Sequence, residues 1–391
     1  MTRETLPRLL FVMDNDFGAL GTVAYLMHGQ PLSARATLLL PQRAHELHKG
    51  RLPIASRPYQ SLQDILDFAE ADSPDVVFLF SGYLLTSQRL LTIRALRRLI
   101  RTLRQRGCAV ASSDPYLGTF RRIADADVPA RAGFIHRFLH AKRVQRHVRK
   151  VADLLADVTH VYPVPVDALE SGSPAKRASF FNPLYIRSLE ELRDNSAAVS
   201  ALSGGPPGVR RWLFVLAQFD LEFQEKKHGQ QGFADIVAGR IREALDSGRH
   251  ATFIGPASVT QALSARFAGN PGITLLPFCP FEEFERRLLD AEIVFLWHIF
   301  STSAFLRLWN GLPVFFFDPG HVPRLLMPLY EAALKHYYMG ASPVVLDIEK
   351  PLDADLLMEL SANFPTSARE ACRRLSHLPG PEEMVSAITR R

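Results

Sequence analysis

The chain has 391 residues, 22% of them charged and 47% apolar, which predicts a globular protein of two domains rather than a disordered chain. No apolar run approaches the roughly 20 residues of a membrane-spanning helix, and the first run, Leu9–Met13, is too short for a secretion signal. Three widely spaced cysteines exclude a disulfide framework and a CxxC-type zinc site, so we expect a cytoplasmic protein.

Positive charge is concentrated in the first half of the chain. Residues 1–200 carry 27 Lys and Arg against 19 Asp and Glu, a surplus of +8. The remaining residues carry 19 against 21, a balance of −2. This asymmetry indicates that one domain meets an anionic partner.

The first half alternates short apolar runs with longer helical patterns, which is typical of βαβ units and a parallel sheet. The predicted strands are Leu9–Asp14, Ala36–Leu40, Val76–Phe80, Cys108–Ser112 and Thr159–Val164. The predicted helices lie near Leu20–His28, Leu62–Glu70, Gln88–Arg106 and Ile135–Ala156. The continuous apolar character of the predicted strands favours a sheet that is covered on both faces.

A run of Gly, Pro and Ser between residues 203 and 208 predicts a linker, which gives domains at 1–203 and 209–391. After it, strands and helices alternate again about every 20 residues, which predicts five or six parallel strands. The predicted strands are Trp212–Ala217, Thr252–Ile254, Ile273–Leu276, Glu292–Trp297, Pro313–Phe317 and Val344–Leu346. The predicted helices are Phe233–Leu245, Val259–Phe267, Phe281–Leu289, Ser303–Asn310 and Pro323–Tyr338, and the last 40 residues are expected to be helical.

The fold class expected from this pattern is α/β, with two doubly wound, Rossmann-like parallel-sheet domains that face each other across a cleft. Ligands of open α/β sheets bind beyond the carboxyl ends of the strands. We therefore expect the functional residues in the loops that follow the strands.

Three hydroxyl residues, Ser301, Thr302 and Ser303, stand where a predicted strand ends and a helix begins. The free N–H groups and positive dipole end of a helix favour a phosphate at this position. Ordinary N-capping by a Ser or Thr side chain is the alternative interpretation.

The region that contains this loop resembles the donor-binding region of GT-B glycosyltransferases. The likeness rests on Gly311-Leu312-Pro313-Val314, on the strand closed by Asp318-Pro319, and on Leu276-Pro277 before Leu288-Leu289-Asp290-Ala291. It covers about residues 210–330, and it extends to the whole chain only as architecture. Gly255, at the end of the Thr252–Ile254 strand, stands where the family often has a Gly.

The resemblance implies a nucleotide-sugar donor bound in the second domain. The residues expected to contribute to donor binding are Gly255, Pro277, Lys226, Lys227, His298, Ser301, Thr302, Ser303, Asp318 and His321. The two lysines are expected in a long loop after the first strand of that domain. Many family members carry a donor-binding Glu at the position of Leu306, and its absence leaves an inverting enzyme, an unusual donor such as a CMP-sugar, or a fold without transfer activity.

The first domain is expected to bind the acceptor. Gly18 and Gly21 resemble the glycine-rich first loop of the family, and a dinucleotide-binding motif is a poorer match because the second glycine of GxGxxG is absent. Asp16 and Asp114 are rival general bases for an acceptor hydroxyl, and a turn aspartate is the alternative for each. Arg121 and Arg122 are further candidates, for an anionic acceptor.

Two Arg-rich helical patterns, near residues 94–104 and 137–150, are explained either as solvated faces of amphipathic helices or as a patch for an anionic membrane surface. We expect a glycan or lipid-linked acceptor, peripheral binding at the inner membrane face, and no nucleic acid. We expect no cofactor and no required metal, because no DxD motif stands at a strand end; Asp125-Ala126-Asp127 lies in a predicted loop. A non-catalytic ligand-binding or scaffold protein and a sugar-nucleotide epimerase are the alternative functions.

Overall fold

The computed structural model describes residues 6–14, 22–23, 26–27, 31–86, 90–119, 122, 146–147, 149–166, 176–183, 210–320 and 326–390. These residues form two compact units. Unit 1 comprises the described residues within 1–185, 327–332 and 377–391, and unit 2 comprises those within 186–326 and 333–376.

Unit 1 is built on a seven-stranded parallel sheet in the order β3-β2-β1-β4-β5-β6-β7. Its strands are β1 (Leu9–Val12), β2 (Ala36–Pro41), β3 (Ala55–Tyr59), β4 (Val76–Leu79), β5 (Ala109–Ser113), β6 (Thr159–Tyr162) and β7 (Ala178–Phe180). All five strands expected in this half are present within a few residues. The two edge strands β3 and β7 were not expected from the sequence.

The strands of unit 1 are buried on both faces. Along β1, Leu9 and Phe11 belong to one apolar cluster, and Leu10 and Val12 belong to the other. This alternation follows from the two-residue period of a strand. The parallel sheet therefore has a core on each side, as the continuous apolar runs predict.

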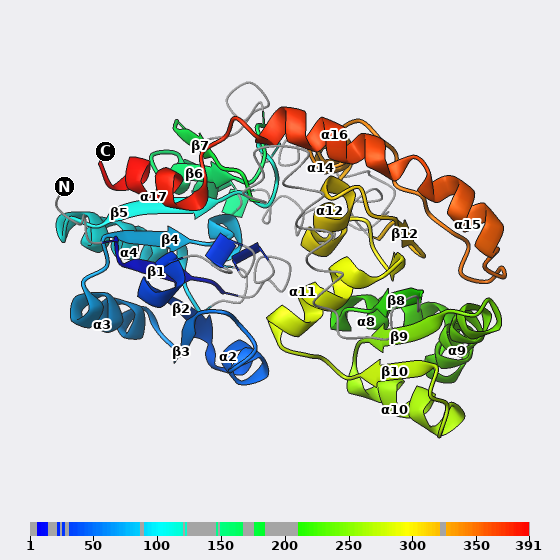
Figure 1. The fold of residues 1–391 in the computed structure, drawn as a ribbon. Coiled ribbons are helices and arrows are strands. Elements are labelled where there is room, and N and C mark those ends of the chain that lie inside the picture. The colour runs from blue at the N-terminus through cyan, green and yellow to red at the C-terminus, as the bar shows by residue number, and fades with distance from the viewer. Residues whose placement is uncertain are drawn as a thin grey trace, which may run out of the picture. The chain divides into compact units, whose positions relative to one another are not determined.

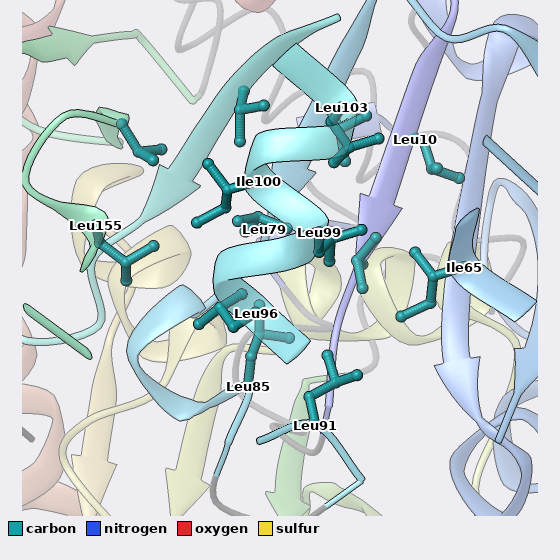
Figure 2. Close-up of a cluster of buried hydrophobic side chains, with 14 of the residues drawn as sticks. Leu10, Ile65, Leu79, Leu85, Leu91, Leu96, Leu99, Ile100, Leu103 and Leu155 are labelled. Carbon is teal, nitrogen blue, oxygen red and sulfur yellow. The ribbon is translucent and has the colours of Figure 1, made fainter. Parts of the chain in front are cut away.

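Helices from distant parts of the chain cover the two faces of this sheet (Figure 1). The helical elements of unit 1 with assigned bounds are η1 (Pro31–Arg35), α2 (Gln42–His48), α3 (Leu62–Asp72), η2 (Gly82–Leu84), α4 (Ile93–Gln105) and α17 (Pro381–Thr389). Figure 2 shows how α4 directs its leucines into the core shared with Leu10 and Leu79. On the opposite face, α17 contributes Met384, Val385 and Ile388, so the end of the chain completes the first unit.

The described part of unit 2 holds a five-stranded parallel sheet in the order β10-β9-β8-β11-β12, which confirms the expected doubly wound domain. Its strands are β8 (Arg211–Val215), β9 (His250–Ile254), β10 (Ile273–Leu276), β11 (Ile293–Leu296) and β12 (Val314–Phe316). The strand expected at Val344–Leu346 is wrong. Only an isolated bridge joins Val345 to Phe316 there.

The helices of unit 2 are α8 (Gln218–His228), α9 (Gln230–Asp246), α10 (Ala257–Arg266), α11 (Phe281–Asp290), α12 (Thr302–Trp309), α15 (Ala354–Ser361) and α16 (Phe364–Leu375). Helix α14 (Met327–His336) contributes to both units. In the part of the chain that the structure describes, no helix is both long enough and apolar enough to cross a bilayer.

Candidate functional site

The carboxyl edge of the second sheet has a switch point between β8 and β11. These two strands are neighbours, although β9 and β10 extend the sheet on one side and β12 extends it on the other. Connections that leave in opposite directions open a crevice at this point, which is where ligands of such sheets bind. The segments after β8 and β11 therefore form the candidate site.

Helix α12 begins at this edge, and Ser301, Thr302 and Ser303 occupy its N-terminus as the sequence predicts. Ser301 is the N-cap residue in an extended conformation, but its hydroxyl accepts no hydrogen bond from the helix. Side-chain capping is therefore not what this serine does in the structure. The first-turn N–H groups have no acceptor within the helix, so this terminus can bind an anion.

His298 follows β11 and lies beside the start of α8. Its Nε2 atom is 3.6 Å from Oδ2 of Asp220, and 29% of the His298 side chain is exposed. Burial lowers the pKa of His298 to about 4, against the Asp318 carboxylate, which acts to raise it. The imidazole is therefore neutral at pH 7 and can donate from one ring nitrogen and accept at the other.

Asp318 follows β12 and fixes the turn in which it stands. Its Oδ1 atom accepts a hydrogen bond from the backbone N–H of Gly320 at 2.6 Å, and Gln224 of α8 donates to Oδ2 at 3.5 Å. Gly320 has a φ of 74°, and a Cβ atom there would lie 3.0 Å from Cβ of His298. The turn therefore needs a glycine, and it carries Asp318 to the same edge as His298.

The expected position of Lys226 and Lys227 in a long loop is wrong. Both lysines lie in the last turn of α8, where positive charge favours the negative end of the helix dipole. The Lys227 ammonium lies 4.0 Å from Glu349, and that of Lys226 lies 5.8 Å from the centre of the Phe223 ring. Both lysines are exposed, and their role in donor binding stays a prediction.

Gly255 and Pro277 follow the neighbouring strands β9 and β10. A Cβ atom at Gly255 would lie 2.8 Å from Cζ of the buried Phe253 ring, so close packing requires the glycine. Pro277 is exposed, and the next residue, Phe278, keeps 44% of its surface exposed. The β10–α11 loop therefore presents an aromatic ring that could stack on a flat ligand.

Leu306, at the position where the resemblance would place a donor-binding Glu, is 8% exposed. It forms part of the buried face of α12.

In the first unit, Asp114 anchors a turn at the end of β5. Its Oδ1 atom accepts from the N–H of Tyr116 at 2.8 Å, and its Oδ2 atom accepts from the N–H of Gly118 at 2.8 Å and from the Tyr162 hydroxyl at 2.9 Å. The side chain is buried, and burial raises its pKa against the opposing effects of His160 and these hydrogen bonds. This arrangement fits the turn aspartate that was the alternative for Asp114.

Of the remaining first-domain candidates, the structure describes Arg122. Arg122 forms an exposed ion pair with Glu331 at 3.0 Å. Asp16, Gly18, Gly21 and Arg121 lie outside the described residues, as do Asp125 and Asp127. The donor-binding candidate His321 of the second domain also lies outside them.

Sequence analysis missed two polar residues near these edges and a third at the amino-terminal side of the second sheet. Asp220 lies within an unexpected helix, so nothing in the sequence connected it to His298. Asp14 follows β1 and is buried. Burial of Tyr59, together with the Asp14 carboxylate, raises the pKa of Tyr59.

The third missed residue is Arg307, which is completely buried in α12. Its guanidinium donates to backbone carbonyls of α11, of the segment between α11 and β11, and of the segment before β12. The acceptors are Leu288 (3.0 Å), Leu289 (3.4 Å), Ala291 (2.8 Å), Glu292 (3.2 Å) and Pro313 (2.7 Å). The signal in the sequence was a single arginine within the apolar run Ala304–Trp309 of this helix.

Among the residues that the structure describes, no group of three His, Cys, Asp or Glu side chains is arranged to hold a metal ion.

Comparison of the sequence with models of protein families and with curated proteins gives no match. Solved structures, by contrast, resemble the whole chain. The spinosyn rhamnosyltransferase SpnG has a TM-score of 0.57 at 13% identity, over 98% of this chain and 100% of its own. An H444N variant of the wall teichoic acid polymerase TagF has a TM-score of 0.54 at 11% identity, over 98% and 88%. The glycosyltransferase SnogD from Streptomyces nogalater has a TM-score of 0.51 at 14% identity, over 99% of both chains. With its two parallel-sheet α/β units, the chain has the fold of GT-B glycosyltransferases.

Proposed function

We propose that the protein is a metal-independent glycosyltransferase, which moves a sugar from a nucleotide-sugar donor to a hydroxyl of a glycan or lipid-linked acceptor. The observation that carries this proposal is the N-terminus of α12 beside His298 at the β8–β11 switch point, where the Ser301 hydroxyl does not cap the helix. Likeness to SpnG and SnogD supports the fold, and a fold alone does not establish activity.

The chemistry of transfer matches this arrangement. As the bond between sugar and phosphate breaks, negative charge grows on the departing nucleotide. N–H groups and hydroxyls fixed at a helix N-terminus stabilise such charge without reorganising. The neutral imidazole of His298 adds a hydrogen-bonding group at the same edge.

Transfer also requires a base that takes the proton of the acceptor hydroxyl. Both Asp114 oxygens already accept hydrogen bonds inside the first unit, so we assign this role to Asp16. A single displacement assisted by this base would invert the configuration of the sugar carbon.

The second candidate function is a non-catalytic protein that binds a nucleotide sugar. The observation that favours it is the buried Leu306, which leaves α12 without a carboxylate where the resemblance leads us to expect one.

Nucleotide binding is the first test. We would measure thermal shifts with UDP, GDP, CDP, CMP, dTDP and ADP, each with and without a divalent metal. A ligand at 100 times its dissociation constant adds about 2.7 kcal/mol, which shifts the melting temperature by a few degrees. We expect nucleotides of one nucleobase to raise the melting temperature selectively. We expect EDTA to leave this increase unchanged.

Two variants locate the binding. Replacing Ser301 and Ser303 together by Ala should weaken the selected nucleotide at least tenfold. Ser264→Ala is the matched control, because the Ser264 hydroxyl donates within α10 to Thr260 at 2.9 Å. Equal binding by both variants would remove the phosphate site from α12.

Turnover then separates the functions. With the selected nucleotide sugar, a transferase releases the nucleotide only when a sugar-accepting hydroxyl is present, and Asp16→Asn should abolish release while binding persists. A change of the nucleotide sugar without acceptor would instead identify an epimerase. Binding without any turnover would favour the non-catalytic protein.

A further inference from the structure

Helix α4 presents a continuous row of arginines. Its residues at spacings of three and four are Arg94, Arg97, Arg98, Arg101 and Arg104, and the helix contains no acidic residue. We call these five side chains the arginine face. Ten residues of helix separate the first from the last, so the row is about 15 Å long. The opposite side of α4 is packed in the core through Leu96, Leu99 and Leu103 (Figure 2).

The described residues leave most of this charge without an ion-pair partner. Arg94, Arg97, Arg98 and Arg101 are exposed, and none of them makes an ion pair with a described residue. Arg104 donates to the backbone carbonyl of Asp157 at 2.7 Å. By contrast, Arg106, just beyond the helix, pairs with Glu70 at 2.8 Å.

A groove of about 640 Å³ runs beside the arginine face, between α4 and the helical residues 149–155. Its lining residues are Arg97, Ile100, Arg101, Arg104, Gln105, Lys150, Asp153, Leu154 and Asp157. Four are cations and two are carboxylates, and Asp157 is already paired with Lys176 at 2.7 Å. The groove therefore combines excess positive charge with two aliphatic side chains.

We propose that the arginine face docks the protein on an anionic lipid bilayer, with lipid phosphates seated along the groove. A row of this length meets several phosphates at once, which a membrane surface supplies and a single free phosphate does not. Leu90, 38% exposed, lies just before α4 and adds an apolar side chain suited to the lipid interface.

Single-stranded nucleic acid fits this surface less well. Its binding sites combine a cationic groove with exposed aromatic rings on which bases stack. In the described part of unit 1, the large apolar residues that are exposed are all aliphatic: Leu47, Leu90 and Met327. The inference does not depend on the proposed sugar transfer, because binding alone tests it.

The experiment is flotation of the full chain with vesicles of phosphatidylcholine, with or without 30% phosphatidylglycerol, at low and high salt. We expect binding only to the anionic vesicles, and its loss at high salt. Each basic residue near such a surface contributes about 1 kcal/mol, so Arg97→Gln with Arg101→Gln should weaken binding about thirtyfold.

The matched control is Arg43→Gln with Lys49→Gln, which removes two exposed charges from α2 and its C-cap in the same unit. This variant should bind vesicles nearly as well as the wild-type protein, and both variants should keep its melting temperature. Equal loss in the two variants would overturn the proposal, because binding would then depend only on the net charge of the protein. Binding of an RNA oligonucleotide or of inorganic phosphate through Arg97 and Arg101, without vesicle binding, would also overturn it.

Discussion

Replacing Arg307 by Met should destabilise unit 2 strongly, because the Arg307 guanidinium supplies hydrogen-bond donors to carbonyls at the end of α11. The last carbonyls of a helix have no N–H partner within it. Arg307 supplies donors to Leu288 in the final turn of α11 and to Ala291 immediately after it, and also reaches Pro313 before β12. One guanidinium thus joins α12 to α11 and to the entry of the edge strand β12.

The magnitude follows from the acceptors. Three carbonyls lie within 3.0 Å of the guanidinium, and a buried carbonyl left without its donor costs about 1–3 kcal/mol. Methionine fills similar volume and removes a charge whose burial lowers the pKa of Arg307 to about 9, which offsets part of the loss. We expect a net loss of about 3 kcal/mol in the free energy of unfolding.

Urea denaturation and thermal melting measure this loss. For a domain of this size, about 3 kcal/mol corresponds to a fall of about 6–12 °C in melting temperature. Arg287→Met is the matched control on α11, because it removes only a partly exposed pair with Glu283 worth about 0.3–0.5 kcal/mol. If the Arg307 variant unfolds within about 0.5 kcal/mol of wild type, the carbonyls have other donors and the capping role is refuted.

Three further predictions follow from the edges of the sheets. His298 stays neutral in the folded state while the unfolded chain takes up a proton near pH 6.5, so its contribution to stability falls from pH 6.5 to about 4; His298→Gln should remove about 2 kcal/mol of this acid sensitivity in pH-dependent denaturation. Gly255→Ala forces a Cβ against the buried Phe253 ring and should cost about 1–3 kcal/mol, whereas Gly239→Ala, with open space around its Cβ, should stabilise α9; equal effects would contradict the packing argument. Asp114→Asn puts an amide donor into a site that faces N–H and O–H donors and should cost about 1–3 kcal/mol; unchanged stability with lost turnover would return Asp114 to the role of base.

The fold could be predicted where a strand is buried on both faces, because such strands are continuous apolar runs. Strand β3 could not be predicted in this way, because it carries Pro58 and three of its five residues are exposed. Helix α8 could not be predicted either, because helices are recognised in a sequence by an apolar stripe. Two of its three buried residues, Asp220 and Gln224, are polar, so no apolar stripe indicates a helix.

The candidate site was predictable where its residues are contiguous. Ser301 to Ser303 follow a strand directly, and their place at a helix start depends on local sequence alone. The contact between His298 and Asp220 joins segments 78 residues apart, and only the strand order brings them together. Periodicity carries no information about such pairing.

Acidic residues at strand ends show why a role cannot be assigned from position. Asp14, Asp114 and Asp220 all follow parallel strands, where ligands and turns compete for the same carboxylates. Asp114 is buried and accepts hydrogen bonds from the N–H groups of its own turn, which is a structural role. Asp220 is also buried, but it lies against a partly exposed histidine beside an uncapped helix terminus. What distinguishes the two is therefore not the residue type or its distance from the strand, but whether its polar neighbours still face solvent that a substrate can replace.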